Sequence, residues 1–249
     1  LAAINGTRWF HEAARDVIDV NINGTLSTLA AAERWNARYV FASSPEAFGE
    51  EELMPLSERS STAFPSAHEH QRHSYGGSKY LGEVALQHAV AAGLDARIVR
   101  PFNAYGPRLL GDAYGQVIGM MFQAVSSKQA IQIHGDGTQT RCFTHIDDVV
   151  EGFILAGELD VDLVQGKPLA GSSFNIGSSE EVSIAELARC IKVAVNDLDV
   201  EVAHTEGYHG DSKRRVPDCT SSEQLLGWQC TTKLGHGLLR VWQELNVQP

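Results

Sequence analysis

Residues 75–79 read Tyr75-Gly76-Gly77-Ser78-Lys79, so that a phenol and an ammonium group lie four residues apart. The segment that follows, 80–90, is typical of a helix, and positions i and i+4 share one face of a helix. A lysine held beside a tyrosine favours the phenolate and lowers the pKa of the phenol from about 10. Such a tyrosine can exchange a proton with a sugar hydroxyl while a hydride moves. We interpret Tyr75 and Lys79 as a candidate catalytic pair, for which a solvated helix face is the alternative.

A predicted strand and a serine-containing turn precede this pair. Residues 38–42 are a short apolar run, which is typical of a buried strand in a parallel sheet. The run leads directly into Ser43, Ser44, Pro45 and Glu46. Because ligands of open α/β sheets bind beyond the carboxyl ends of the strands, we expect Ser44 and Glu46 to reach that crevice. An ordinary turn is the alternative, but the order of strand, serine and Tyr–Lys helix favours a catalytic site.

Seven blocks of sequence match the motifs of one enzyme family, in the same order. They are L-A-A at 1–3, V-N-x-x-G-T at 20–25, S-S-x-E-x-F-G at 43–49, R-P-x-N-x-Y-G-P-R at 100–108, G-D-G-x-Q-x-R-x-F at 135–143 with its continuation at 146–149, R-x-P-D within 213–218 and L-G-W within 225–228. Phe48 stands where the family usually has tyrosine. By these blocks the chain resembles an extended short-chain dehydrogenase/reductase of the NAD-dependent nucleotide-sugar epimerase/dehydratase/decarboxylase family.

The resemblance implies an α/β fold: a Rossmann-like doubly wound parallel sheet with a smaller C-terminal α/β substrate domain. It assigns residues 1–105, with about 142–158 and 172–178, to an NAD-binding domain. It assigns about 106–141 and 179–249 to a nucleotide-sugar-binding domain. Helix and strand signals that alternate along the chain agree with such a fold.

The family also begins with a strand, a G-x-x-G-x-x-G turn and a helix whose N-terminus receives the pyrophosphate of NAD. This fingerprint does not occur in the sequence, which starts at Leu1. We therefore expect the N-terminal part of the Rossmann-like domain to be missing. We also expect the chain alone to hold NAD poorly and to lack activity if the turn is decisive.

Local patterns place the remaining elements. We expect one long helix from about 12 to 35 that is interrupted at 21–25, and a polar loop over 50–74. A capping box of Ser183 and Glu186 marks the start of a further helix. The other expected strands lie at 96–100, 130–134, 173–177 and 200–203, and the other expected helices at 183–195 and 234–245.

Family resemblance gives the candidate residues their roles. Tyr75 is the expected acid/base at the sugar 4-hydroxyl, with Lys79 tuning it and Ser44 sharing a hydrogen bond with the same oxygen. The expected catalytic residues are Ser44, Glu46, Tyr75 and Lys79. The expected NAD-binding residues are Ala2, Ala3, Asn21, Ser43, Tyr75, Lys79 and Pro101. The expected substrate-binding residues are Ser44, Asn103, Arg108, Arg141 and Arg215, of which the arginines suit phosphate oxygens.

Glu46 and Pro45 bear on the branch of the family. Oxidation at C4 gives a ketone that acidifies C5 and makes a C5 carboxyl group labile. A dehydratase needs a carboxylate base together with an acid, and Pro45 stands at the position of that acid without a side-chain donor. A 4-epimerase needs neither group, so we favour an epimerase, then a decarboxylase of the UDP-glucuronate type, then a 4,6-dehydratase. A non-catalytic nucleotide-sugar-binding fragment is the alternative of another class.

Composition bounds the remaining classes. The 249 residues carry a net charge of −11 with dispersed acidic residues, which disfavours a nucleic-acid partner. The four cysteines show no C-x-x-C pair, so a reducing, cytoplasmic location fits and structural zinc does not. No apolar run approaches the roughly 20 residues of a membrane span. We expect a nucleotide-sugar substrate and no membrane partner.

Two further features stay open at this point. His68, His70 and His73 form an H-x-H-x-x-H cluster, for which incidental histidines of a lid loop are favoured over a metal site. Family members commonly pair through the helix that carries Tyr and Lys, so a homodimer is expected. Apolar residues that allow such pairing are Leu81, Val84, Ala85, Leu86 and Ala89.

Overall fold

The computed structural model describes residues 3–69, 71–109, 111, 116–207 and 211–247. Its helices are α1 (Thr7–Glu12), α2 (Ala14–Trp35), the 3-10 helix η1 (Pro45–Phe48), α3 (Ser74–Ala91), α4 (Val117–Ser126), α5 (Ile146–Glu158), α6 (Ile184–Ala194), α7 (Thr220–Leu226) and α8 (Leu234–Val247). Its strands are β1 (Tyr39–Ala42), β2 (Ala96–Pro101), β3 (Ala104–Tyr105), β4 (Ile131–His134), β5 (Thr140–Cys142), β6 (Thr144–His145), β7 (Ser173–Ile176), β8 (Glu181–Ser183), β9 (Val202–Thr205) and β10 (Arg214–Arg215). Across these described stretches, every helix is too short or too polar to cross a membrane.

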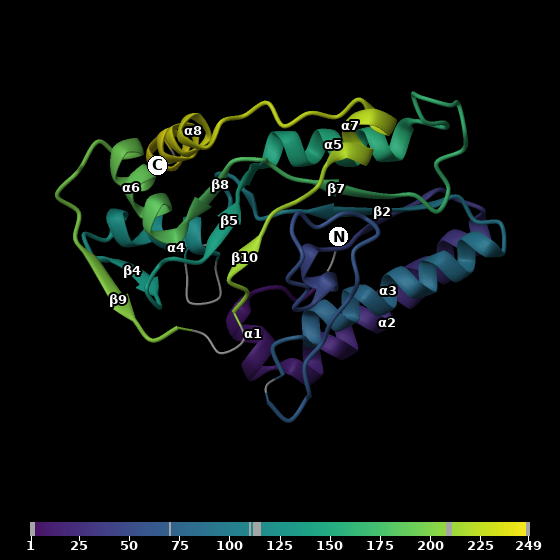
Figure 1. Ribbon diagram of the computed structural model, residues 1–249, viewed down its shortest axis with the longest axis horizontal. Helices are drawn as coiled ribbons and strands as arrows, with labels where there is room; N and C mark the ends of the chain where they lie inside the picture. Colours follow the sequence, from purple (N-terminus) through teal and green to yellow (C-terminus); the bar gives the residue numbers. More distant parts are fainter. Residues whose placement is uncertain (1–2, 70, 110, 112–115, 208–210, 248–249) are drawn as a thin grey trace.

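A parallel sheet in the order β1-β2-β7 forms the centre of one part of the molecule. β1 pairs with β2 in the register Tyr39 to Ala96, and β2 pairs with β7 in the register Ile98 to Ser173. The pair α2 and α3 covers one face of this sheet, and α5 with α7 covers the other (Figure 1). The result is a three-layer α/β/α arrangement of parallel strands, which is typical of a doubly wound fold.

Alternation of side chains along β2 builds both apolar layers. Ala96 and Ile98 are buried in the core that contains Leu86 of α3. Val99 belongs instead to the core on the other face, with Phe174 of β7. Successive residues of a strand point to opposite faces, so β2 is buried on both faces, and its apolar residues carry the strand signal although Arg97 and Arg100 are buried with them. This explains why the strand signal at 96–100 was readable from the sequence.

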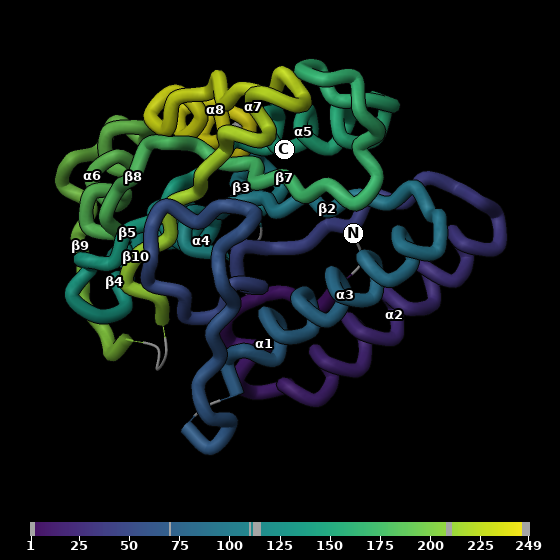
Figure 2. The backbone as a smooth tube through the Cα atoms, turned by 45° about the vertical axis from the view of Figure 1, so that its right-hand side comes forward, coloured from purple at the N-terminus to yellow at the C-terminus, as the bar shows by residue number. Residues whose placement is uncertain are grey.

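The second part of the molecule has an apolar core of its own. β4 pairs in parallel with β9, and β10-β5-β8 form a small sheet. Ile131, Leu187 and Leu238 are buried there, and the rings of Phe122 and Trp242 stack with centroids 5.6 Å apart. Figure 2 shows α4, α6 and α8 on the left with these strands, away from α2 and α3 on the right. The two cores bring the ends of β1 and β2 opposite β5.

The expected elements agree with the structure except in a few places. The predicted interruption at 21–25 is wrong, because α2 runs unbroken and the chain breaks earlier, at Ala13 between α1 and α2. The hydroxyl of Thr25 donates to the carbonyl oxygen of Asn21 at 2.7 Å, and Gly24 has open space around it, so neither residue disturbs the helix. Helices α1, α4, α5 and α7, the 3-10 helix η1 and the short strands β3, β5, β6, β8 and β10 were not predicted. Strand β9 begins two residues later than expected.

The predicted start of α6 is confirmed. Ser183 is the N-cap of this helix, and its hydroxyl accepts a hydrogen bond from the amide of Glu186 at 3.0 Å. Such a bond satisfies one of the amides that a helix N-terminus leaves unpaired. The cap therefore fixes where β8 ends and α6 begins.

Asn21 joins three segments around the buried end of α3. Its amide oxygen accepts from the backbone amide of Ile4 at 2.8 Å, and its amide nitrogen donates to the carbonyl oxygen of Ile4 at 3.2 Å and to the hydroxyl of Ser78 at 3.3 Å. Asn21 is almost fully buried. It therefore braces the helix that carries Tyr75, as the family resemblance implied.

We predict that Asn21→Ala lowers the free energy of unfolding by about 1–3 kcal/mol, because buried partners of Asn21 lose their hydrogen bonds. Asn23→Ala is the matched control, since Asn23 is exposed and bonds only to Asp19 among the described residues. Urea unfolding of both variants measures the difference. Equal stabilities of the two variants would contradict the bracing role.

Candidate active site

A cavity lies where the carboxyl ends of β1 and β2 face the second part of the molecule. Ser44, Glu46 and Tyr75 line it from the side of the parallel sheet. Arg141 and Ile184 line it from the opposite side. The cavity therefore sits at the crevice beyond the strand ends, where open α/β sheets bind their ligands.

Tyr75 lies in the first turn of α3, buried against the ring of Phe10. The two rings stack with centroids 4.8 Å apart, and Tyr75 is 7% exposed. Burial raises the pKa of Tyr75 to about 12, although a hydrogen bond with Ser44 opposes that rise. The expectation of a lowered phenol pKa is wrong for this structure. Desolvation, which the sequence did not reveal, dominates the environment of the phenol.

Lys79 lies one turn further along the same helix. Its ammonium nitrogen donates to the carbonyl oxygen of Ala42 at 2.7 Å and lies 5.6 Å from the centroid of the Tyr75 ring. Burial lowers the pKa of Lys79 to about 8, against the charge of Glu83, which raises it. The lysine is thus anchored at the end of β1 and points only partly toward the phenol.

A buried ion pair between Glu83 and Arg100 supports the turn that carries Ser43 and Ser44. Glu83 accepts hydrogen bonds from Arg100 at 2.7 and 2.6 Å, and one of its oxygens also accepts from the hydroxyl of Ser43 at 2.5 Å. The guanidinium of Arg100 lies over the ring of Phe48, 4.8 Å from its centroid. Glu83 follows Lys79 by four residues on one helix face, so helical spacing could have revealed it.

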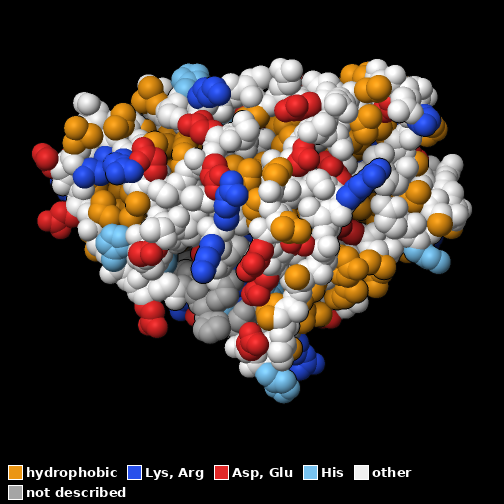
Figure 3. All heavy atoms as spheres, in the orientation of Figure 1, with side chains coloured by type: hydrophobic (Ala, Val, Ile, Leu, Met, Phe, Trp, Pro, Cys, Tyr) orange, Lys and Arg blue, Asp and Glu red, His pale blue; other side chains and the backbone are white. Residues whose placement is uncertain are grey.

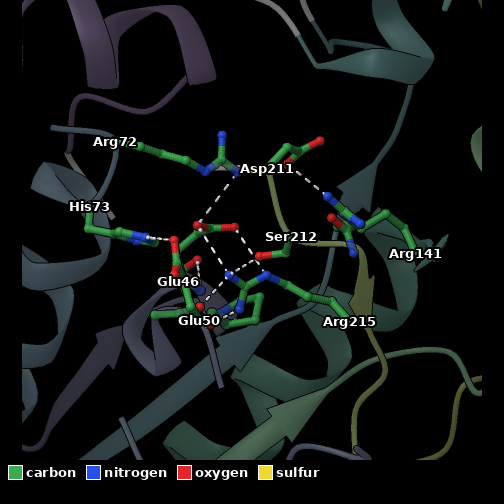
Figure 4. A network of polar contacts seen from close by, with 12 residues as sticks. Glu46, Glu50, Arg72, His73, Arg141, Asp211, Ser212 and Arg215 are labelled. Atoms are coloured by element: carbon green, nitrogen blue, oxygen red, sulfur yellow. Dashed lines mark hydrogen bonds and ion pairs between the residues drawn. The ribbon is translucent and has the colours of Figure 1, made fainter. Parts of the chain in front are cut away.

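Glu46 and Arg215 form the centre of a second network (Figure 4). Arg215 is 2% exposed, donates to the carbonyl oxygens of Pro45 at 2.7 Å and Gly49 at 2.8 Å, and lies 3.4 Å from a carboxylate oxygen of Glu46. Burial pushes the pKa of Glu46 upward, but the charges of Arg215 and its neighbouring arginines outweigh burial and leave that pKa below its ordinary value. Glu46 is therefore ionised at neutral pH.

The expected site residues fall into two groups. Those that line the cavity are Ser43, Ser44, Glu46, Tyr75, Pro101, Asn103 and Arg141. Those that the structure describes but does not place in the cavity wall are Ala3, Asn21, Lys79, Arg108 and Arg215. Arg108 is exposed, and Ala2 lies outside the described residues.

Asn103 and Arg141 show how the substrate side of the cavity is held. Asn103 adopts a φ of 40° and donates to the carbonyl oxygen of Cys142 at 3.0 Å. Arg141 donates to the carbonyl oxygen of Thr140 at 2.8 Å and pairs with Asp211 at 2.9 Å. Its guanidinium thus faces the cavity in contact with a carboxylate.

Sequence reasoning missed three charged residues of the cavity wall, of which Arg8 lies in α1 and pairs with Glu12. Arg72 precedes Tyr75 by three residues but lies at the end of a loop without periodicity. Asp211 comes from a polar segment of the C-terminal part and carries no motif. Of the histidine cluster, His68 is exposed, His73 lies 3.1 Å from Glu50, and the remaining histidine is outside the described residues.

Comparison with known proteins places this site in a family. Residues 1–177 match the NAD dependent epimerase/dehydratase family. The chain is 33% identical over 243 residues to UDP-N-acetyl-alpha-D-glucosaminuronate decarboxylase of Bacillus cytotoxicus. This match covers 96% of this chain and 73% of that protein. It is 32% identical over 237 residues to UDP-glucuronic acid decarboxylase 6 of Arabidopsis thaliana, over 93% of this chain and 64% of that protein. The chain spans 49% of UDP-glucuronic acid decarboxylase 1 of the same plant.

Solved structures show the same fold. UDP-glucose 4-epimerase of Thermotoga maritima, solved with UDP-glucose, superposes with a TM-score of 0.87 at 25% identity, covering 99% of this chain and 75% of that one. UDP-glucuronic acid 4-epimerase of Bacillus cereus, solved with UDP-glucuronic acid and NAD, superposes with a TM-score of 0.85 at 26% identity, covering 99% and 74%.

The chain belongs to the NAD dependent epimerase/dehydratase family. The resemblance inferred from the sequence motifs is therefore confirmed, as is the Rossmann-like α/β fold. The family is one of NAD-dependent enzymes, which confirms the expected class of activity and of cofactor.

We predict that Arg215→Leu lowers the free energy of unfolding by about 3–5 kcal/mol, because it leaves Glu46 and two buried carbonyl groups without their cation. Its neighbour Arg214 is the matched control, because Arg214 is exposed and pairs with Glu181. Arg214→Leu should leave thermal and urea unfolding nearly unchanged. Two variants of equal stability would show that Arg215 does not hold the site together.

Proposed function

We propose that this site acts on a nucleotide-linked hexuronate, oxidises its C4 hydroxyl group and releases the C5 carboxyl group as CO₂. The observation that carries the proposal is the convergence of Ser44, Tyr75 and ionised Glu46 on one cavity, with Lys79 directly behind the phenol. A catalytic set of this kind serves proton transfer at a reacting hydroxyl and is not needed for binding alone. The non-catalytic alternative is therefore disfavoured.

The residues present fit the nicotinamide–ribose half of NAD. The ammonium of Lys79 is buried and makes one hydrogen bond among the described residues, which leaves donors for ribose hydroxyl groups. Ser43 and Pro101 line the cavity at the ends of β1 and β2, beside Tyr75. When bound, NAD supplies the hydride acceptor for C4.

Tyr75 and Ser44 handle the proton of the C4 hydroxyl group. With a pKa of about 12, Tyr75 keeps its proton at neutral pH in this structure, which suits the step in which the C4 oxygen regains a proton. The oxidative step needs the phenolate, which the nearby ammonium of Lys79 favours. Ser44 lines the cavity together with Tyr75 and can hold the same sugar oxygen.

Loss of CO₂ follows from the ketone at C4. The C5–C6 bond breaks, its electron pair passes to the ketone oxygen, and C5 then takes up a proton as the ketone re-forms. The hydride removed from C4 then returns to that carbon and the C4 oxygen takes up a proton, which gives the nucleotide pentose. The curated relatives described above are decarboxylases of nucleotide-linked uronates, which supports this outcome. The ion pair with Arg215 keeps the carboxylate of Glu46 in the cavity wall, close to Ser44.

Epimerisation at C4 is the second candidate. Pro45 offers no side-chain donor, and an epimerase needs none, because the ketone only has to be reduced on its other face. Two of the structural neighbours are 4-epimerases, one of them crystallised with UDP-glucuronic acid. The division into an NAD-binding and a substrate domain, and a cytoplasmic location, stay predictions.

We also propose that the chain pairs with a second copy through α2 and α3. Ile18, Leu26, Leu81 and Val84 are between 45% and 52% exposed on these helices. Figure 3 shows apolar side chains gathered toward the lower right, over the region of α3. Leu86 and Ala89, which the sequence analysis included in such a surface, are instead buried in the core of the subunit together with partly buried Ala85.

We predict that Val84→Lys converts a dimer into a monomer, because a buried lysine at an apolar interface lacks a partner. Light scattering after size-exclusion chromatography measures the mass. Val193→Lys is the control, since Val193 is 68% exposed on α6, away from this surface. A wild-type chain that is already monomeric, or a Val84→Lys dimer, would contradict the interface.

We predict that Tyr75→Phe reduces kcat by about 10²–10⁴, because it removes the proton-transfer group while keeping the stacked ring. Binding of the nucleotide sugar changes little, because the ring and the arginines remain. NMR of the product and calorimetric titration measure the two quantities. Tyr80→Phe is the matched control on the exposed side of α3.

Product identity separates the candidates. With NAD and UDP-glucuronate, a decarboxylase gives a nucleotide pentose and CO₂, whereas an epimerase gives the C4 epimer with its carboxyl group intact. We expect the pentose. The epimer alone would establish the second candidate, and binding without turnover would establish the non-catalytic alternative.

A further inference from the structure

Arg72 is a nearly fully buried charged residue of the cavity wall that no sequence motif singled out. It is 4% exposed, and its Nη2 atom lies 3.0 Å from the carboxylate of Asp211 and 3.9 Å from that of Glu46. Its Nε and Nη1 atoms are buried and make no hydrogen bond to any described residue. Buried guanidinium donors without acceptors are costly, so their retention in a cavity wall points to an acceptor that arrives with a ligand.

Asp211 holds this arginine together with Arg141. The same oxygen, Oδ1, accepts from Arg72 at 3.0 Å and from Arg141 at 2.9 Å. Figure 4 shows Asp211 between Arg72 and Arg141, at the end of the Arg72 guanidinium that also faces Glu46. All three residues line the cavity. A carboxylate is thus already bound between two cations at the place where the substrate enters.

Charge in this cluster favours an additional anion. Three guanidinium groups, those of Arg72, Arg141 and Arg215, face the two carboxylates of Glu46 and Asp211, while the third acid of the network, Glu50, lies at its more exposed edge against His73. A carboxylate has two oxygens in one plane, which match the fork of a guanidinium group. Asp211 binds Nη2 through one oxygen, so an anion in its place that uses two oxygens can bind Nη2 together with a neighbouring donor of Arg72 that is now unpaired.

We propose that Arg72 binds the C5 carboxylate of the hexuronate, and that Asp211, which bridges Arg72 and Arg141, occupies this place until the substrate arrives. The inference rests on the proposed function and names Arg72 as the residue that recognises the carboxylate by which hexuronates differ from other sugars. Its geometric basis is adjacency: Arg72 lies beside Glu46, which follows Ser44 by two residues, and Ser44 lines the same cavity as Tyr75, the proposed proton-transfer group at C4. C5 is the neighbouring ring atom, so its substituent falls next to the C4 site.

The diphosphate of the same ligand offers the other source of anionic oxygens. UDP-glucuronate and UDP-glucose distinguish the two sources, because they share the diphosphate and differ only in the carboxylate or hydroxymethyl group at C5. Titration calorimetry with both ligands uses the whole chain with NAD in a Tyr75→Phe background, so that neither ligand is consumed. The variants are Arg72→Gln, Asp211→Asn and, as a matched control on the same loop, exposed Arg59→Gln.

The expected result is a weakening of UDP-glucuronate binding by about tenfold or more in Arg72→Gln, with UDP-glucose affected little. Asp211→Asn should tighten UDP-glucuronate binding and leave UDP-glucose nearly unchanged, because the competing carboxylate is gone. Arg59→Gln should change neither. If Arg72→Gln fails to fold, Arg72→Lys keeps the charge without the fork and should give a smaller loss in the same direction.

Other outcomes overturn the inference. An equal loss for both ligands in Arg72→Gln would assign this arginine to the diphosphate, and no loss for either would remove it from the site. Asp211→Asn that binds UDP-glucuronate no more tightly would show that Asp211 does not occupy the place of the substrate. If the chain with intact Arg72 binds neither ligand, the proposed function itself fails, which is a different result from binding both without discrimination.

Discussion

One guanidinium group holds the two parts of the molecule in register. Arg215 belongs to β10, in the part with the second apolar core, yet it donates to the carbonyl oxygens of Pro45 and Gly49 on the serine turn of the first part. The turn carries Ser44 and Glu46, so its position relative to the opposite wall depends on this contact. A buried arginine with matched acceptors is costly to break, which makes it a geometric constraint on the cavity.

Burial sets the chemistry of the cavity as much as charge does. The phenol of Tyr75 and the ammonium of Lys79 are both desolvated, so the pKa of the first lies above its ordinary value and that of the second below it. The pKa of Glu46 lies below its ordinary value, because the charges of the surrounding arginines outweigh the effect of burial. At neutral pH the phenol is therefore neutral and Lys79 remains a cation, while the carboxylate of Glu46 adds a negative charge to the cavity wall. Such an arrangement separates proton transfer from anion recognition.

The sequence predicted the parts that depend on local pattern and on the strand-end rule. Ser44 and Tyr75 meet because both follow from motifs at the end of β1 and the start of α3. The raised pKa of Tyr75 was not predictable, since Phe10 stacks on it only after the chain folds. The difference between exposed Arg108 and buried Arg215 is likewise tertiary, because both lie in equally good motifs. Arg72 was not predicted because the sequence of its loop shows neither helical nor strand periodicity.

The most direct test of the central claim follows deuterium at C4 of the sugar. The chain is incubated with NAD and UDP-glucuronate that carries deuterium at C4, and NMR follows rate and product. Oxidation and reduction at C4 predict slower turnover than for the protiated substrate and a product that keeps the deuterium at C4 after CO₂ has left. A product with solvent hydrogen at C4, or no conversion of either substrate, would contradict the account.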